Sequence, residues 1–238
     1  MKKIMALVMA LIFTISLAAC ENSENSSNLP NSQTASQNSD QTQETGNSGE
    51  GSNNAADSGG RVLVAYFAVA ENSEVDAVAS ASVVTVDGEA MGITAALANM
   101  IADETGGDLF SIQTNVDYPA DINDVIDYAA EEQDSNARPE LITHIENLED
   151  YDTIFVGYPN WWYDMPMVMY SFFDEYDFSG KTIIPFNSHN GSRFSDTINT
   201  IQELEPNATV ITDGFTVRFS DAANAQGDIS QWLDGLGY

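Results

Sequence analysis

Cysteine and basic residues are both scarce in this chain of 238 residues. Cys20 is the single cysteine, so thiol–disulfide chemistry and cysteine-ligated iron–sulfur clusters are excluded from everything that follows it. Seven residues are Lys or Arg and 37 are Asp or Glu, which gives a formal net charge of −30. Nucleic-acid binding depends on clustered Lys and Arg and is therefore excluded. The charge would attract a cationic partner, but we favour solubility and repulsion from anionic surfaces as its explanation.

Long apolar runs are also missing, except at the start of the chain. Lys2 and Lys3 precede an apolar run, residues 4–19, which is too short for a stable membrane span and has the pattern of a secretory signal. We predict a lipoprotein signal peptide over residues 1–19. Residues 17–20, Leu-Ala-Ala-Cys, resemble a lipobox, in which the cysteine is lipidated and becomes the mature N-terminus. Cys20 would then anchor the protein to the membrane, with its domain outside the cytoplasm; the alternative is a cleaved signal with an incidental cysteine.

The segment after Cys20 has almost nothing to bury. Residues 21–60 contain no aromatic residue, and Leu29 is their only large apolar residue. Such a composition cannot bury enough surface to offset chain entropy. We therefore expect residues 20–60 to be a lipidated, disordered tether with an r.m.s. reach of roughly 35 Å. Its Ser, Asn and Gln content suits a monoderm cell, while Glu21 leaves sorting to an outer membrane open.

Residues 61–238 have the length of one domain and alternate between apolar runs and helical periodicity. The expected strands are residues 62–67, 109–113, 153–158, 182–186 and a final strand, 209–218, that is interrupted at Asp213 and Gly214. The expected helices are residues 94–105, 122–130, 141–148, 166–173, 195–204 and 229–236. This alternation predicts an α/β fold, with a parallel sheet wound on both faces.

Two of these strands lead into loops with groups suited to a planar ligand. Residues 158–162 are Tyr-Pro-Asn-Trp-Trp, and residues 188–192 are Ser-His-Asn-Gly-Ser. Open α/β sheets bind ligands at the carboxyl ends of their strands. Two adjacent Trp residues there can present a flat apolar platform to a planar ring. The alternative is that one or both Trp rings only cap the core.

Residues 151–162 and 181–192 together resemble the flavodoxin-like family, in the branch built on GYP-WW and GKTI-PF-THGGS loops. The resemblance covers most of residues 61–238. It implies a five-stranded sheet in the order 2-1-3-4-5, and FMN as cofactor, with its isoalloxazine ring between the two loops. The site residues it implies are Trp161 or Trp162 as the stacking ring, Tyr158 or Pro159 as loop-shaping residues, Asn160 at the ring edge, and Ser188, His189, Asn190, Gly191 and Ser192 at the pyrimidine end.

The second loop departs from the family pattern at two positions. Asn190 stands where the family has glycine, and Arg193 follows the loop. Contacts that need a bare backbone at position 190 are therefore in doubt. Asn tolerates a positive φ better than most residues, so we expect the turn to persist.

The phosphate site departs further. The family holds phosphate in a Ser/Thr-rich loop after the first strand, where this chain has Ala68 and an inserted segment, residues 73–90. A helix N-terminus with hydroxyl and backbone N–H groups is the alternative means of holding a dianion. The candidates come from two separated pieces: Glu71 and Asn72, and Gly92, Ile93 and Thr94. The competing hypothesis is a degenerate loop that no longer binds phosphate.

His189 could belong to a hydrolase site or a metal site, but the sequence lacks the other residues that such sites need. No G-x-S-x-G elbow is present for a hydrolase, and no second His or Cys is near enough to share a metal. His189 is left as a donor to a flavin carbonyl, as a proton relay, or as a loop histidine bonded to backbone. The acidic clusters lack the EF-hand pattern, so we predict no metal site. We expect His144 to face solvent, and Arg138 to form an internal ion pair.

Two functions remain open. The first is an FMN-dependent redox protein on the cell surface that passes electrons to another protein or to a small acceptor such as a quinone. No G-x-G-x-x-G fingerprint is present, so an electron carrier fits better than a self-sufficient NAD(P)H reductase. The second is a non-enzymatic lipoprotein that has lost FMN and serves as a ligand-binding or interaction module. For the first, the negative charge predicts a low potential for the second electron.

Overall fold

The computed structural model describes residues 60–71, 82–86, 88–119 and 121–238, which all lie in the compact unit Asn53–Tyr238. The predicted signal peptide, Cys20, the tether up to residue 59 and the candidate Asn72 lie outside these residues. No helix in the described part of the chain is long and apolar enough to cross a membrane.

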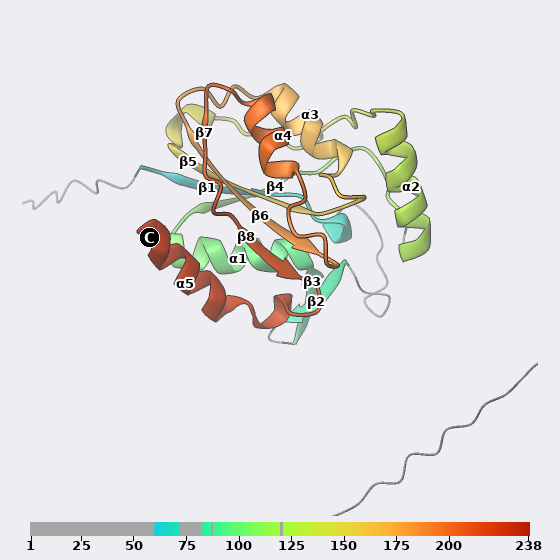
Figure 1. Cartoon of the computed structure of the whole chain (residues 1–238), viewed down its shortest axis with the longest axis horizontal. Helices are drawn as coiled ribbons and strands as arrows, with labels where there is room; N and C mark the ends of the chain where they lie inside the picture. Colours follow the sequence, from blue (N-terminus) through green and yellow to red (C-terminus); the bar gives the residue numbers. More distant parts are fainter. Residues whose placement is uncertain (1–59, 72–81, 87, 120) are drawn as a thin grey trace, which may run out of the picture. The chain divides into compact units, whose positions relative to one another are not determined.

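The core of the unit is a parallel sheet in the order β4-β1-β5-β6-β7, with β8 also paired to β6 (Figure 1). The strands are β1 (Val62–Tyr66), β4 (Asp108–Ser111), β5 (Thr153–Pro159), β6 (Thr182–His189), β7 (Thr209–Val210) and β8 (Phe215–Arg218). Because β7 and β8 are the two halves of the predicted interrupted strand, this confirms the predicted order 2-1-3-4-5.

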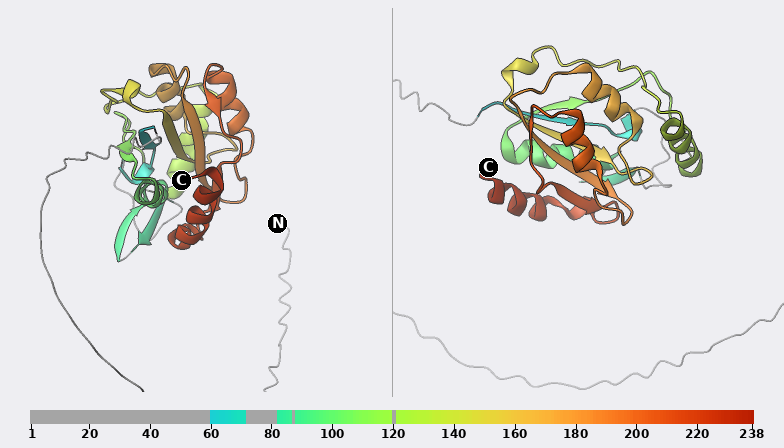
Figure 2. Two further views of the ribbon diagram at one scale, coloured as in Figure 1. Left: turned by 90° about the vertical axis from the view of Figure 1, so that its left-hand side faces the viewer. Right: turned by 45° about the horizontal axis from the view of Figure 1, so that its top comes forward.

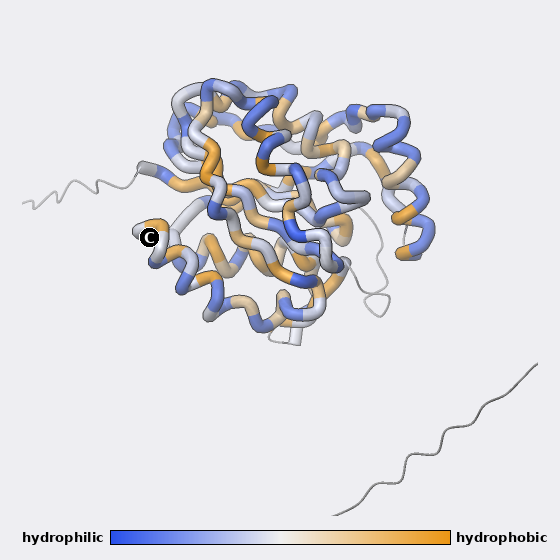
Figure 3. Tube along the Cα trace, in the orientation of Figure 1, coloured by the Kyte–Doolittle hydropathy of each residue, from blue (hydrophilic) through white to orange (hydrophobic). Residues whose placement is uncertain are grey.

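Helices cover both faces of this sheet (Figure 2). α1 (Ile93–Thr105) and α5 (Gln226–Leu236) pack on one face, and α3 (Met167–Glu175) and α4 (Thr197–Leu204) on the other. The strands alternate their apolar side chains between the two faces: Val64 packs on the α1 side, Leu63 and Ala65 on the other. Hydrophilic residues alternate with apolar ones along α2 (Ile122–Asp134) and α4 (Figure 3). The fold is therefore the doubly wound α/β fold that the alternation predicts.

Short elements complete the unit. They are the 3₁₀ turns Val69–Glu71, Leu148–Asp150 and Ala222–Asn224, and an antiparallel hairpin of β2 (Val83–Val86) and β3 (Glu89–Gly92). The hairpin lies in the inserted segment and runs directly into α1. We did not predict it, because we considered residues 73–90 only as an insertion into the phosphate loop.

The predicted helix over residues 141–148 is wrong. Leu141 forms an isolated antiparallel bridge with Thr114, and the Ile142 N–H donates to the Gln113 carbonyl at 2.9 Å. These long-range hydrogen bonds replace the local ones that a helix needs. His144 is exposed, as expected, but lies in this extended segment, with Nδ1 2.6 Å from the Glu175 carboxylate.

Two element boundaries also differ from the prediction. β6 continues to His189, so Ser188 and His189 belong to the strand and the loop begins at Asn190. α4 begins at Thr197 and not at Ser195, because the φ of 53° at Ser195 is not a helical angle. The loop between β6 and α4 therefore spans residues 190–196.

Candidate functional site

A pocket of about 540 Å³ opens at the carboxyl ends of β5 and β6. The end of β5 and the loop after it form one wall, the end of β6 and its loop form a second, and α2 contributes an apolar third. The lining residues are Ser82, Ile122, Val125, Ile126, Ala129, Pro159, Asn160, Trp161, Trp162, Tyr163, Ser188, His189, Asn190, Gly191, Ser192 and Phe219. The structure thus brings the two predicted loops together around one cavity.

Asn160 joins the two loops. Its backbone N–H donates to the Ser188 carbonyl at 2.8 Å, and its side-chain Oδ1 accepts from Ser192 Oγ at 2.9 Å. Its Nδ2 lies 3.4 Å from Ser195 Oγ. Asn160 therefore makes most of its hydrogen bonds within the protein, and its main effect is to fix the spacing of the two walls.

The two adjacent tryptophans occupy different environments. Trp161 is half-buried, with its ring edge-to-face with Phe67 at 5.8 Å and with Tyr118 at 5.7 Å between centroids. Trp162 is 49% exposed, and its Nε1–H donates to the Ile126 carbonyl of α2 at 2.9 Å. Trp162 is thus the ring with an open face, while Trp161 is built into the core.

The backbone carrying these rings is a tight turn. Trp161 and Asp164 exchange both backbone hydrogen bonds at 2.9 Å, and Trp162 and Tyr163 between them have φ values of 49° and 66°. Left-handed backbone at two large aromatic residues costs on the order of 1–3 kcal/mol each, and such strain clusters at binding sites. Tyr163, which we had not predicted, is 73% exposed at the pocket mouth.

His189 contributes a neutral imidazole. Its Nδ1 accepts the N–H of Gly191 at 2.7 Å, which places the proton of the neutral ring on Nε2. Burial lowers the pKa of His189, and the nearby guanidinium groups of Arg218 and Arg193 lower it further. At neutral pH the pocket wall therefore carries an uncharged N–H donor.

The turn after β6 depends on glycine at one position. Gly191 has a φ of 117°, which L side chains rarely adopt. Arg193 and Ser195 also have positive φ, whereas Asn190 does not. The turn therefore does not depend on the tolerance of Asn190 for a positive φ.

The predicted phosphate residues do not line the pocket. Gly92, Ile93 and Thr94 are buried at the start of α1, and the Ile93 N–H already donates to the Ser82 carbonyl at 3.0 Å. The Glu71 carboxylate accepts hydrogen bonds from Tyr66, at 2.9 Å, and from Ser111. The ring-binding candidates line the cavity, with the exception of Tyr158. Tyr158 is fully buried, with its hydroxyl on Thr197, and shapes the loop from below.

Sequence reasoning missed one wall. The stripe Ile122, Val125, Ile126 and Ala129 predicts a helix face in the core, but all four residues line the pocket and Ile126 is 43% exposed. Nothing in the periodicity distinguishes a core face from a pocket wall. Phe219, just after β8, could have been found from the rule that strand ends carry the site.

The chain is similar to a known family and to solved structures. The family model described as flavodoxin matches residues 82–236, which leaves β1 outside the match. A flavoprotein assigned in Bacteroides uniformis is 27% identical over 74% of this chain and 99% of its own, with a TM-score of 0.56. A flavoprotein assigned in Bacteroides eggerthii is 24% identical over 75% of this chain and 98% of its own, with a TM-score of 0.57. No curated protein matches the chain.

Proposed function

The chain belongs to the flavodoxin family, and we propose that it binds FMN in the pocket beyond β5 and β6 and works as an electron-transfer protein. The observation that carries the proposal is the cavity itself. Two loops braced by Asn160 face the apolar side of α2, and the exposed ring of Trp162 extends from the first loop to a hydrogen bond with α2. A flat aromatic ring fits this combination of one stacking surface, apolar walls and a few polar groups.

The polar wall suits the edge of a flavin ring. The Nε2–H of His189 lies on the β6 side of the pocket, beside the backbone of Asn190 and Ser192, while the Gly191 N–H is already bonded to His189 Nδ1. The neutral state of His189 lets it donate a hydrogen bond to a carbonyl without adding charge. FMN, when bound, supplies the one- and two-electron chemistry, and the chain's share is to hold the ring and exclude water.

The natural setting belongs to the same proposal. We place the protein outside the cytoplasm, held to the membrane by a lipid on Cys20, with a small acceptor such as a quinone or another protein as its redox partner. The motivation is the signal pattern of residues 1–20. Replacing Cys20→Ser should abolish incorporation of a labelled fatty acid in the native host, and labelling that persists would refute the anchor.

A second candidate function is favoured by a specific observation. Gly92, Ile93 and Thr94 do not reach the pocket, and Glu71 is bonded to Tyr66 and Ser111. A flavodoxin fold without a phosphate site could serve as a flavin-free ligand-binding or interaction module.

Titration of FMN into the chain from Glu21 to Tyr238 separates the two candidates. We expect saturable quenching of flavin and tryptophan emission in the wild type and loss of binding in Trp162→Ala. The matched control is Trp232→Phe, because Trp232 lies on α5, on the other face of the sheet, with its Nε1–H on the Asp213 carbonyl. Absence of binding by the wild type at high micromolar FMN would leave the flavin-free module as the function.

A further inference from the structure

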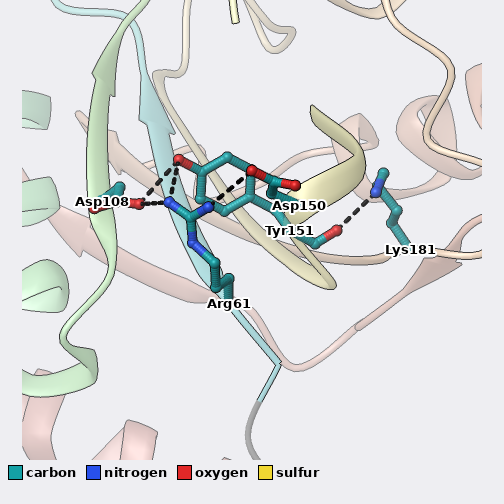
Figure 4. Close-up of polar contacts among 5 residues, drawn as sticks. All are labelled: Arg61, Asp108, Asp150, Tyr151 and Lys181. Atoms are coloured by element: carbon teal, nitrogen blue, oxygen red, sulfur yellow. Dashed lines mark hydrogen bonds and ion pairs between the residues drawn. The ribbon is translucent and has the colours of Figure 1, made fainter. Parts of the chain in front are cut away.

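Basic residues are rare in the domain, and most of them are already paired. Arg61 donates to Asp108 at 2.7 Å and to Asp150 at 3.0 Å, at the start of β1 (Figure 4). Lys181 donates to the Tyr151 carbonyl at 2.7 Å, beside the same cluster (Figure 4). These two cations stabilise the end of the sheet at which β1 and β6 begin.

Arg138 is paired as well. Its Nε lies 2.7 Å from the Asp174 carboxylate, which confirms the predicted internal ion pair. Its guanidinium also stacks over the Tyr170 ring at 4.9 Å. It is thus occupied on two sides.

Arg193 and Arg218 differ from the other three. Within the described part of the chain, neither guanidinium has an ion pair or a hydrogen bond, although the protein has 37 acidic residues to offer. Both side chains are exposed. Two like charges on one rim repel each other, and a bound anion would offset that repulsion.

Both arginines lie beside the pocket. Arg218 is the register partner of His189 across β8 and β6, and a Cβ on Gly191 would sit 3.7 Å from the Arg218 Nη2. Arg193 closes the same loop, and its carbonyl accepts from Asn187 Nδ2 at 3.0 Å. Both guanidiniums act on the titration of His189, with Asp221 the one carboxylate that acts in the opposite direction. Of the three charged groups that act on His189, two are positive and one is negative, so the surroundings of His189 favour an anion.

We propose that Arg193 and Arg218 form an oxyanion site at the rim of the pocket, for the acidic group of a planar ligand. Guanidinium groups present fixed forks of N–H donors that match phosphate, sulfonate and carboxylate groups. This proposal rests on the proposed function in one respect: the planar ring in the pocket is taken to be a flavin or its electron acceptor. The anion has two possible sources: the phosphate of FMN, because the described candidates at the start of α1 do not line the pocket, or an acidic group on the electron acceptor.

The test compares charged and uncharged pairs of ligands on the chain from Glu21 to Tyr238. FMN is paired with riboflavin, and a naphthoquinone sulfonate with its uncharged parent quinone, each followed by tryptophan fluorescence. The variant is Arg193→Gln with Arg218→Gln. The matched control is Arg61→Gln with Arg138→Gln, which removes the same charge at paired positions away from the pocket.

In the wild type, at least one charged ligand should bind more tightly than its uncharged partner. The rim variant should lose that preference by about tenfold or more, while the control keeps it. Loss confined to FMN identifies the phosphate as the anion, and loss confined to the sulfonate identifies the acceptor. The proposal is overturned if the rim variant keeps every preference, or if the control loses as much. A wild type that binds neither flavin contradicts the proposed function, while the quinone pair still tests the arginines.

Discussion

Neighbouring residues in this chain can have opposite tasks, as Trp161 and Trp162 show. The ring of Trp161 is packed edge-on against Phe67 and Tyr118, while the ring of Trp162 has half its surface in solvent. Both residues belong to one tight turn. A shift of the chain by one residue would therefore move the buried ring into solvent and the exposed ring into the core.

This difference predicts separate outcomes in stability and binding. Trp161→Ala should lower the free energy of unfolding by about 3 kcal/mol, because it leaves a cavity between aromatic rings. Trp162→Ala should cost far less, since its ring is half exposed and its one hydrogen bond is to the Ile126 carbonyl. Urea unfolding of both variants measures the two values, and equal losses would show that the rings share one role.

Glu132 is an unusual residue to find buried on α2. It is 7% exposed, and its carboxylate lies 3.3 Å from the hydroxyl of Tyr118, the ring that packs on Trp161. Burial raises the pKa of Glu132 to about 7, and the Tyr118 hydrogen bond opposes part of that rise. Burial likewise raises the pKa of Glu205 to about 7.

A raised carboxyl pKa has a definite sign in a pH titration of stability. Between the ordinary pKa of about 4.5 and the folded value of about 7, the folded state binds more protons than the unfolded one. The stabilisation is complete below that window and is lost as the pH rises through 7. We expect the free energy of unfolding to fall from pH 5 to pH 8, and less steeply in Glu132→Gln, measured by denaturant unfolding at each pH. Glu131→Gln, at an exposed neighbouring position, is the control; an unchanged slope in Glu132→Gln would exclude Glu132 as the cause.

At the scale of elements, α2 connects helix capping with the pocket. Asp121 caps its first turn by accepting from the Asn123 N–H at 2.8 Å, and the apolar face of the helix lines the cavity. Removing this cap should loosen the wall without altering any residue in it.

Asp121→Ala should therefore lower stability by about 1 kcal/mol and weaken FMN binding. Amide hydrogen exchange should quicken in the first turn of α2, measured beside the FMN titration. Asp127→Ala, an exposed mid-helix change on the same element, should do neither. Unchanged exchange in Asp121→Ala would mean that packing alone holds the helix.

Some elements follow from local sequence patterns, and others depend on contacts between residues far apart in the chain. The strands of the sheet follow from apolar runs, and the break between β7 and β8 follows from Asp213 and Gly214. Residues 141–148 could not be predicted, because their backbone bonds to residues 113–114, far back in the chain. The loops after β5 and β6 were found because strand ends carry sites, whereas the wall of α2 and the rim arginines depend on tertiary placement that no local pattern encodes.

At the scale of the whole molecule, the charge of −30 sets a field that opposes electrons on a bound flavin. We expect the second electron to enter at a lower potential than in free FMN, and the potential to rise with salt, which screens the distant carboxylates. Arg193 and Arg218 work against this field from close range, so replacing both with Gln should lower the potential further. Redox titration at low and high salt measures these shifts; a hydroquinone that forms more easily than in free FMN at low salt would contradict the expectation.

The strands of the main sheet all point the same way, and this decides which end of the sheet carries the pocket. The chain enters at Arg61, where β1 begins, while the pocket opens at the ends of β5 and β6, which run parallel to β1. A bead, an electrode or a fluorescent protein joined directly to residue 60 would therefore attach at the end of the sheet away from the pocket mouth. Immobilised protein should exchange its ligand as quickly as protein in solution, which would make the N-terminal end the natural handle for a sensor.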